Sequence, residues 1–443
     1  MLRTNRRWFL LFLLVGGMVT AAVAQDSLTL PASQLKKMNP HTARPSDAIE
    51  RLGANKTLKA VGNAGLATGF AANASLPGVD SVVNFSDQFT TPGFDGLGNP
   101  QSVWPYTMVG NPPGAGGFTQ INAPVIPVVV DLLLPDGTIY LSFSGNDNVQ
   151  AALNSPIFLP YLYTSGIGQY NDQMQRATFW NRIHNHGFDN GWHTNLTPRL
   201  KQTRHMRVPF FTPGGARAWF VFADSSGNPV LFALDEGVFV NLLFPTTVPV
   251  DNTTLIGAAE LAGDMRTRDI TTFLFNNVAL FEGNINNCCI LGFHTYDFEP
   301  GDAHNGNRER RYVFNFNSWL SPGLFLFGFQ DATAMSHEMA ELFNDPFVDN
   351  ATPWWENVDP FAGFGICQNN LETGDVIEIQ TSLPVYTVAI GNQTYHLSNE
   401  AMLPWFAFES PSTAHLGAYT FPDESSLTTL SPGPLLPGCK PAP

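Results

Sequence analysis

Charged side chains are scarce in this sequence, and cationic ones are the scarcest. Asp, Glu, Lys and Arg make up 13% of the 443 residues, about half of the roughly 25% that is usual in a soluble domain. There are 22 Lys and Arg against 37 Asp and Glu, so the formal net charge is -15. This balance argues against nucleic acid and anionic membrane surfaces as partners. We count one basic cluster, residues 308–311, and interpret it as a solvated loop or the start of a strand.

Long apolar runs and several common enzyme motifs are also missing. Beyond the N-terminal segment, no stretch reaches the roughly 18 uncharged apolar residues that a membrane helix needs, so we expect no membrane span there. The chain contains no serine nucleophile elbow, no phosphate-binding loop and no dinucleotide fingerprint. The enzyme classes that depend on those motifs therefore find no support in the sequence.

The N-terminus has the pattern of an export signal. Arginines within residues 3–7 precede an apolar run at residues 8–15, and small residues at 22–24 suit a cleavage site. This pattern predicts a signal peptide at residues 1–24 and a secreted or periplasmic protein.

The rest of the chain divides into two parts by composition. Residues 25–75 are rich in Ala, Asn, Gly and Ser, so we expect a flexible tether or pro-segment. We expect residues 76–443 to form a single α+β domain with a mixed or antiparallel sheet, β-hairpins and a helix packed on the sheet. The strand-like runs are 126–134, 138–143, 216–223, 230–234, 270–275, 278–281, 288–293 and 312–319.

The chain has four cysteines, all downstream of the expected signal peptide. An oxidising compartment favours disulfides over a thiolate metal site. Because neighbouring residues of a strand point to opposite faces, we expect Cys288 and Cys289 to pair with Cys367 and Cys439 rather than with each other. The sequence does not say which cysteine pairs with which.

Ionisable residues gather at helical spacing in one segment, residues 331–346. Asp331 is a suitable N-cap, and Pro346 disfavours helical geometry in the residue before it. At about 100° per residue, one arc of this helix carries charged groups and the opposite face carries apolar ones. The charged arc consists of His337, Glu338, Glu341 and Asp345, and the apolar face of Met335, Met339, Leu342 and Phe343.

The pattern His337-Glu338-x-x-Glu341 differs from the zincin motif H-E-x-x-H in its last residue only. Residues i and i+4 lie one above the other on a helix, so His337 and Glu341 can reach one metal ion. Glu338 lies beside that position, where a general base for metal-bound water belongs. The alternative is an ordinary amphipathic helix with solvated acidic side chains.

Catalytic zinc usually has three protein ligands, so another must come from outside the helix. We expect Glu372, with Asp375 as its competitor and His294 and His396 in reserve. Asp345 suits an outer position or a calcium ion. Zinc is the expected cofactor, although calcium or manganese would suit so many oxygen ligands. A Gly- and Asn-rich loop contains further histidines without regular spacing, which we expect to be exposed: His184, His186 and His193.

Short segments around the motif carry a family resemblance. The chain contains Ser336-His-Glu-Met-Ala-Glu, Asn344-Asp-Pro and Cys367-Gln-Asn-Asn-Leu-Glu-Thr-Gly-Asp. It thereby resembles secreted, largely uncharacterised microbial proteins with S-H-E-x-A-E, N-D-P and C-Q-x-x-L-E-x-G-D, and residues 287–294 extend the similarity. More distantly, H-E-x-A-E resembles the plant exordium-type extracellular proteins, which are not established enzymes. The position of Glu372 is similar to that of the third ligand in the gluzincin branch of zincin metallopeptidases.

These features predict a secreted metal-dependent hydrolase, specifically a zincin-like peptidase. His337, Glu341 and Glu372 would hold the metal and Glu338 would act as general base, with an extracellular peptide or polysaccharide as partner. The first alternative is a noncatalytic extracellular protein that binds carbohydrate or cell wall, with a structural metal or none. The second is a structural secreted protein whose motif helix packs and exposes its carboxylates.

Overall fold

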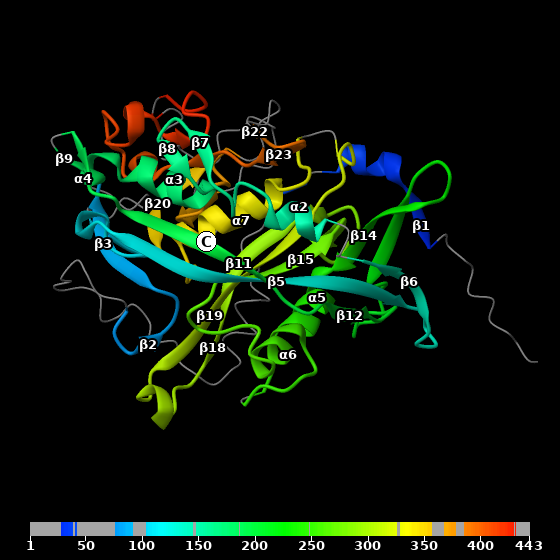
Figure 1. Ribbon diagram of the computed structural model, residues 1–443. Helices are drawn as coiled ribbons and strands as arrows, with labels where there is room; N and C mark the ends of the chain where they lie inside the picture. Colours follow the sequence, from blue (N-terminus) through cyan, green and yellow to red (C-terminus); the bar gives the residue numbers. More distant parts are fainter. Residues whose placement is uncertain are drawn as a thin grey trace, which may run out of the picture.

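The computed structural model describes residues 28–38, 40–41, 76–91, 103–144, 148–185, 187–247, 249–325, 328–356, 367–377, 385–428 and 430. The predicted signal peptide lies outside these residues, as does most of the predicted tether. Two β-sheets, one of eight strands and one of five, organise the described chain (Figure 1). The larger sheet mixes parallel and antiparallel neighbours, which confirms a sheet-rich α+β class.

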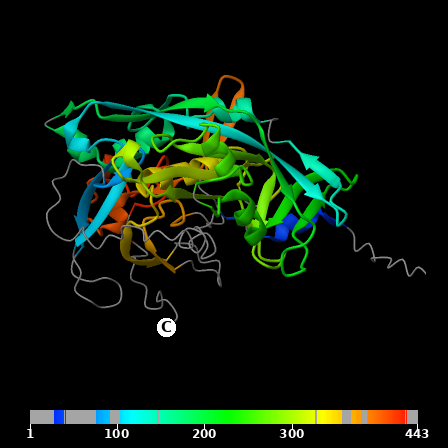
Figure 2. The same cartoon turned by 90° about the horizontal axis from the view of Figure 1, so that it is seen from below.

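The larger sheet is built around one long strand, β5 (Phe118–Leu133), which spans most of the width of the molecule in Figure 2. The other strands are β2 (Val79–Asp80), β6 (Ile139–Phe143), β11 (His193–Leu200), β12 (Arg204–Val208), β15 (Thr271–Asn276), β18 (Gly292–Glu299) and β19 (Glu309–Trp319). The order is β11-β5-β15-β19-β18, with β12 and β6 also paired to β5 and β2 to β19. β5 and β6 form the predicted hairpin.

Both faces of this sheet are covered. Leu274 and Val313 belong to one apolar cluster, whereas their neighbours Phe273 and Phe314 belong to another. Successive side chains of a strand point to opposite faces, so the two clusters lie on opposite sides of the sheet. The helices on the first side are α3 (Tyr170–Thr178) and α7 (Thr333–Asn344), and those on the second are α5 (Glu236–Leu243) and α6 (Leu255–Leu261) (Figure 1).

The smaller sheet incorporates a piece of the segment that was expected to be a tether. Its strands, in order, are β1 (Thr29–Pro31), β13 (Trp219–Ala223), β14 (Pro229–Asp235), β16 (Val278–Phe281) and β17 (Cys288–Ile290). β1 pairs parallel with β13, and the following 3-10 helix η1 (Ala32–Lys37) buries Leu35. This piece is therefore part of the folded domain.

The disulfide expectation is wrong for the adjacent cysteines, because Cys288 and Cys289 are bonded to each other at the start of β17. Side chains of neighbouring residues diverge in a regular strand. Here the peptide bond between the two residues is cis and their Cα atoms are 3.0 Å apart. Cys439, one of the expected partners, lies outside the described residues.

Short elements complete the fold, and the C-terminal ones lie on the α7 side of the larger sheet (Figure 1). Among the described residues, no helix is both long and apolar enough to cross a membrane. The remaining strands are β3 (Asn84–Thr90), β4 (Val103–Val109), β7 (Tyr161–Tyr163), β8 (Gly166–Gly168), β9 (His184–Asn185), β10 (Phe188–Asp189), β20 (Ala351–Glu356), β21 (Cys367–Asn370), β22 (Tyr386–Ile390), β23 (Gln393–Leu397), β24 (Glu400–Ala401) and β25 (Thr420–Phe421). The remaining helices are α2 (Val149–Leu153), α4 (Trp180–Ile183), α8 (Leu403–Phe406), η3 (Pro113–Ala115), η4 (Ala303–Asn305) and η5 (His415–Gly417).

Candidate metal centre

The motif helix α7 begins after Ala332, which is its N-cap and makes no side-chain capping bond. The prediction that Asp331 is the cap is wrong. Its Oδ2 lies 2.6 Å from Nδ1 of His396, and its Oδ1 accepts a hydrogen bond from the backbone N–H of His396. These contacts hold β23 beside the start of α7. They also involve His396, which the sequence placed in reserve as a possible metal ligand. At its other end α7 stops at Asn344, two residues before Pro346.

Every residue of α7 is buried. His337 and Glu338 have no exposed surface, and Glu341 is 3% exposed. The alternative of an amphipathic helix with solvated acidic side chains is therefore wrong. Burying a carboxylate is unfavourable unless opposite charge or hydrogen bonds compensate it, so the groups that face α7 must supply that compensation.

His294, on β18, brings the acidic side chains together. Its Nδ1 lies 3.2 Å from Glu338 Oε2 and 3.5 Å from Glu341 Oε2. Its Nε2 lies 3.8 Å from Glu372 Oε2. The imidazole ring thus connects α7 with the segment that follows β21. The sequence placed His294 only in reserve, but the structure places it at the centre of the cluster.

His337 lies on the other side of the Glu341 carboxylate. Its Nε2 is 3.2 Å from Glu341 Oε1 and 3.5 Å from Asp375 Oδ1, and its Nδ1 is 3.5 Å from Ser398 Oγ. The backbone N–H of Gly374 also donates to Glu341 Oε1, at 3.0 Å. Glu341 therefore directs one oxygen toward His337 and the other toward His294.

Two glycines make room for this arrangement. A Cβ atom at Gly374 would lie 2.3 Å from Cε1 of His337, and one at Gly292 would lie 2.7 Å from Cγ of Glu338. Such distances are far below normal contact. The backbone of β18 and of the segment after β21 can approach α7 this closely only because both positions lack a side chain.

A layer of polar groups holds the carboxylates around the centre. Asn370 Nδ2 donates to Glu372 Oε1 at 2.5 Å. Glu400 accepts hydrogen bonds from the hydroxyls of Tyr170, at 3.1 Å, and Thr373, at 3.0 Å. These contacts fix the orientation of each carboxylate and satisfy part of its capacity to accept hydrogen bonds.

The two aspartates that the sequence proposed for the site have different surroundings. Asp375 lies near His337, and its other oxygen accepts a hydrogen bond from the amide of Gln368. Asp345 accepts hydrogen bonds from the backbone N–H groups of Asp349, at 3.0 Å, and Asn350, at 3.2 Å. Asp345 thus closes the turn after α7.

Burial sets the protonation preferences of the cluster. It raises the pKa of Glu338 to about 7 and the pKa of Glu372 well above its usual value. Burial acts in the same direction on Glu341, but the neighbouring His337 and His294 outweigh it, so the pKa of Glu341 falls below its usual value. Burial would lower the pKa of His294, yet the surrounding glutamates raise it well above its usual value.

Among the described residues, charge compensation within the cluster comes from histidines. In the part of the chain that the structure describes, Glu338, Glu341 and Glu372 form ion pairs with His294 or His337 and with no lysine or arginine. His294 Nε2 and Glu338 Oε1 are buried and have no hydrogen-bond partner. Because buried polar atoms are nearly always paired, these two atoms are candidates for contact with a bound ion.

The residues form two overlapping groups that can hold a metal ion. One consists of His294, Glu341 and Glu372, and the other of His337, Glu338 and Glu341, with ligand atoms within 4.8 Å of one another in each group. Glu341 belongs to both. The predicted ligands His337 and Glu372 fall in different groups. Imidazole nitrogen and carboxylate oxygen are ordinary zinc ligands and also suit manganese.

The loop histidines were expected to be exposed, but His184 and His193 are half-buried and have partners outside this cluster. His193 Nδ1 lies 2.9 Å from Asp172 Oδ2, and the ring of His184 stacks on Trp180 with 3.6 Å between ring centroids. His186 lies outside the described residues. Neither group of candidate metal ligands includes His184 or His193.

Comparisons with known proteins add no identification, since no family model, no curated protein and no solved structure matches this chain.

Proposed function

We propose that this protein is an exported metal-dependent hydrolase whose buried histidine and glutamate cluster holds a divalent cation. The observation that carries the proposal is a set of buried glutamates whose counter-charges, among the described residues, are histidines. A divalent cation would offset the cost of burying these carboxylates. It would also provide a partner for His294 Nε2, which makes no hydrogen bond.

We propose His294, Glu341 and Glu372 as the ligands, because their ligand atoms converge and His294 offers a free nitrogen. This set exchanges one residue of the sequence-derived set, with His294 in place of His337. His337 then has a positioning role. Together with the N–H of Gly374 it holds Glu341 Oε1, which leaves Oε2 for the cation.

Glu338 is the proton acceptor in this proposal. It neighbours Glu341 on α7, and Oε1 of its carboxylate has no hydrogen-bond partner, while Oε2 contacts His294 Nδ1. A bound cation lowers the pKa of a coordinated water. Glu338 would take the proton of that water and return it to the leaving group. The similarity of H-E-x-x-E to the zincin motif supports an extracellular peptide as substrate.

A noncatalytic role with a structural metal is the second candidate. The observation that favours it is burial: His294 is 1% exposed, and so is Glu372. Structural metal sites are closed, whereas catalytic ones keep a position open for water. In this case the ion would join β18, α7 and the segment after β21 in an extracellular protein that binds carbohydrate or cell wall.

Elemental analysis of protein purified without chelator tests the metal centre. We expect about one zinc or manganese per chain, lost from His294→Ala and Glu341→Ala and retained by Glu338→Gln. Loss of the metal from His337→Ala but not from His294→Ala would instead support the ligand set predicted from the sequence, in which His337 is a ligand. Circular dichroism of each variant shows whether the fold survives. Absence of a stoichiometric metal from the folded wild-type protein would overturn the proposal.

A peptide-library assay of the metal-loaded protein separates the two candidates. A hydrolase should cleave peptides, and Glu338→Gln should lower kcat by about 10²- to 10⁴-fold, the usual contribution of a general base. Metal retention without cleavage by the wild-type protein would support the structural candidate. Cleavage that Glu338→Gln leaves unchanged would contradict the role of Glu338.

A further inference from the structure

A second charged feature lies at the far edge of the larger sheet. β11 and β12 both pair with β5, and along them and the short segment that connects them lie Arg199, Lys201, Arg204 and Arg207. Arg266, beyond α6, joins them in the lining of one hollow. We call these five side chains the basic strip. Four of its members lie within residues 199–207, and only Arg266 comes from a segment distant in sequence.

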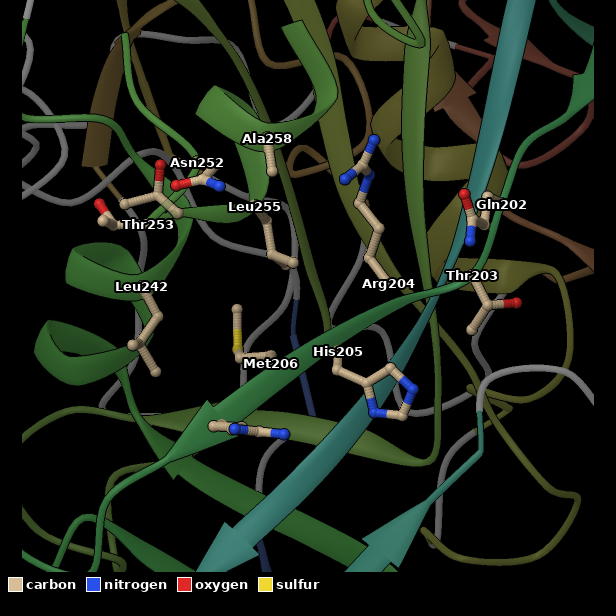
Figure 3. A pocket seen from close by; sticks show the side chains of 12 residues that line it. Gln202, Thr203, Arg204, His205, Met206, Leu242, Asn252, Thr253, Leu255 and Ala258 are labelled. Atoms are coloured by element: carbon tan, nitrogen blue, oxygen red, sulfur yellow. The ribbon is translucent and has the colours of Figure 1, made fainter. Parts of the chain in front are cut away.

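Two hollows open along the basic strip. The first has a volume of about 350 Å³ and includes Arg204 and Arg207 in its lining. Figure 3 shows Asn252 and Thr253 on one side of it, Arg204 and Gln202 on the other, and Leu255 and Met206 between them. The second hollow, of about 470 Å³, includes Arg199, Lys201 and Arg266.

The positive charge of the strip is only partly neutralised. Asp264 Oδ2 lies 2.7 Å from a guanidinium nitrogen of Arg204, and its Oδ1 lies 3.4 Å from Lys201 Nζ. Arg199 and Arg207 are exposed, and within the described structure neither side chain has an ion pair or a hydrogen bond. Their guanidinium groups are therefore available to a ligand.

The cluster at residues 308–311 is a contrasting case. Arg311 is 3% exposed, its Nε donates to Glu309 Oε1 at 2.7 Å, and its guanidinium lies over the ring of Tyr296. Arg310 pairs with Asp302. The interpretation of this cluster as the start of a strand is confirmed, because β19 begins at Glu309, whereas the alternative of a solvated loop is wrong for Arg311. Arg310 and Arg311 contact other parts of the protein, whereas Arg199 and Arg207 of the strip face solvent.

We propose that the basic strip binds an anionic polysaccharide, that is, a chain of sugars with carboxylate or sulfate groups. Arginine forms paired hydrogen bonds with planar carboxylates and binds sulfate in a similar way. The amides of Gln202 and Asn252, in the first hollow, are suited to sugar hydroxyls. From Arg199 to Arg207 the extended chain covers about 25 Å at roughly 3.3 Å per residue. This length fits an elongated ligand.

Two further observations narrow the class of partner. Neither hollow is lined by Phe, Tyr or Trp, so the stacking surface that single-stranded nucleic acid uses is missing there. The net charge of the whole chain is -15. A polyanion is therefore repelled by most of the surface and attracted to the strip.

Binding of the full chain to defined polymers tests the proposal. The probes are polygalacturonate, which carries carboxylates, dextran sulfate, which carries sulfates, neutral dextran, and a single-stranded DNA oligonucleotide. We expect binding to one or both charged polysaccharides, weaker binding to DNA and none to dextran. Affinity should fall as salt rises, because the contacts are exposed charges. The two charged polysaccharides distinguish carboxylate from sulfate recognition.

Matched double variants connect binding with the strip. Arg199→Gln with Arg207→Gln should weaken binding about tenfold or more, since it removes two charge-assisted contacts. Lys37→Gln with Arg308→Gln removes the same charge elsewhere and should change the affinity less than about twofold. Thermal unfolding checks that both variants fold. Equal losses in the two variants, no binding to either charged polysaccharide, or tighter binding of DNA would each overturn the proposal.

Discussion

The buried cluster on the α7 face of the larger sheet and the exposed edge formed by β11 and β12 differ in how they accommodate charge. On the α7 face, His294 and the glutamates are buried and each directs its polar atoms at another member of the cluster. At the edge formed by β11 and β12, the basic strip leaves the side chains of Arg199 and Arg207 exposed and without a partner among the described residues. Water stabilises an exposed charge at little cost, whereas a buried one needs a partner. We therefore expect substitutions in the buried cluster to affect folding and those in the strip to affect binding.

Glu341→Ala should show the largest effect, because Glu341 contacts both histidines of the cluster. Removing one partner from a buried charged network typically costs about 3–5 kcal/mol of unfolding free energy. Urea denaturation followed by circular dichroism measures that loss. Glu282→Ala, at an exposed position, is the control and should stay within about 0.5 kcal/mol of wild type. Similar stability of the two variants would mean that the cluster is not a compensated network.

Gly374→Ala should come next in magnitude. The added Cβ would lie 2.3 Å from the ring of His337, so the ring or the segment after β21 must move. Overpacking of this kind costs about 1–3 kcal/mol, and the displaced His337 would no longer hold Glu341. Gly114→Ala is the matched control, because a Cβ there meets nothing within 4 Å. We expect lower stability and lower metal content from Gly374→Ala only. A retained metal content would argue against the positioning role of His337.

Glu400 should make stability depend on pH. Burial raises its pKa from 4.5 to about 8 in the folded protein. The folded state therefore holds a proton that the unfolded chain has released, and the contribution of Glu400 to stability is lost as pH rises from about 4.5 to about 8. Glu400→Gln should remove this dependence. The slope of the unfolding free energy against pH should then become shallower by up to about 1.4 kcal/mol per pH unit. Unfolding of the chelated protein at several pH values measures the slopes, and parallel curves would contradict the expectation.

Features that depend on local spacing could be predicted from the sequence. The extent of α7 follows from helical periodicity and from Pro346, and the proximity of His337 to Glu341 follows from their spacing of four residues. The β5–β6 hairpin follows in the same way from two apolar runs around a turn.

Features that depend on tertiary register could not be predicted. Which residue of β18 faces α7 is decided by sheet pairing, so His294 could not be ranked above the other reserves. Asp331 has the residue type of an N-cap but contacts His396, 65 residues away. The position of Arg266 beside Arg199 and Lys201 also depends on tertiary structure, whereas the other members of the basic strip lie together within residues 199–207. Predictions from local sequence preference were wrong where a residue distant in the sequence was the better partner, as His396 is for Asp331.

The smallest effect should come from Arg207→Gln, and its comparison with Arg311→Gln separates the two kinds of charge most directly. Arg311→Gln removes a buried guanidinium that pairs with Glu309 and lies over Tyr296, so it should lower the unfolding free energy by about 1–3 kcal/mol. Arg207→Gln, at an exposed position without a partner among the described residues, should change it by less than about 0.5 kcal/mol. Parallel urea titrations measure both. If Arg207→Gln proved as destabilising as Arg311→Gln, Arg207 would have a structural role. The proposal that the basic strip is available to a ligand would then have to be abandoned.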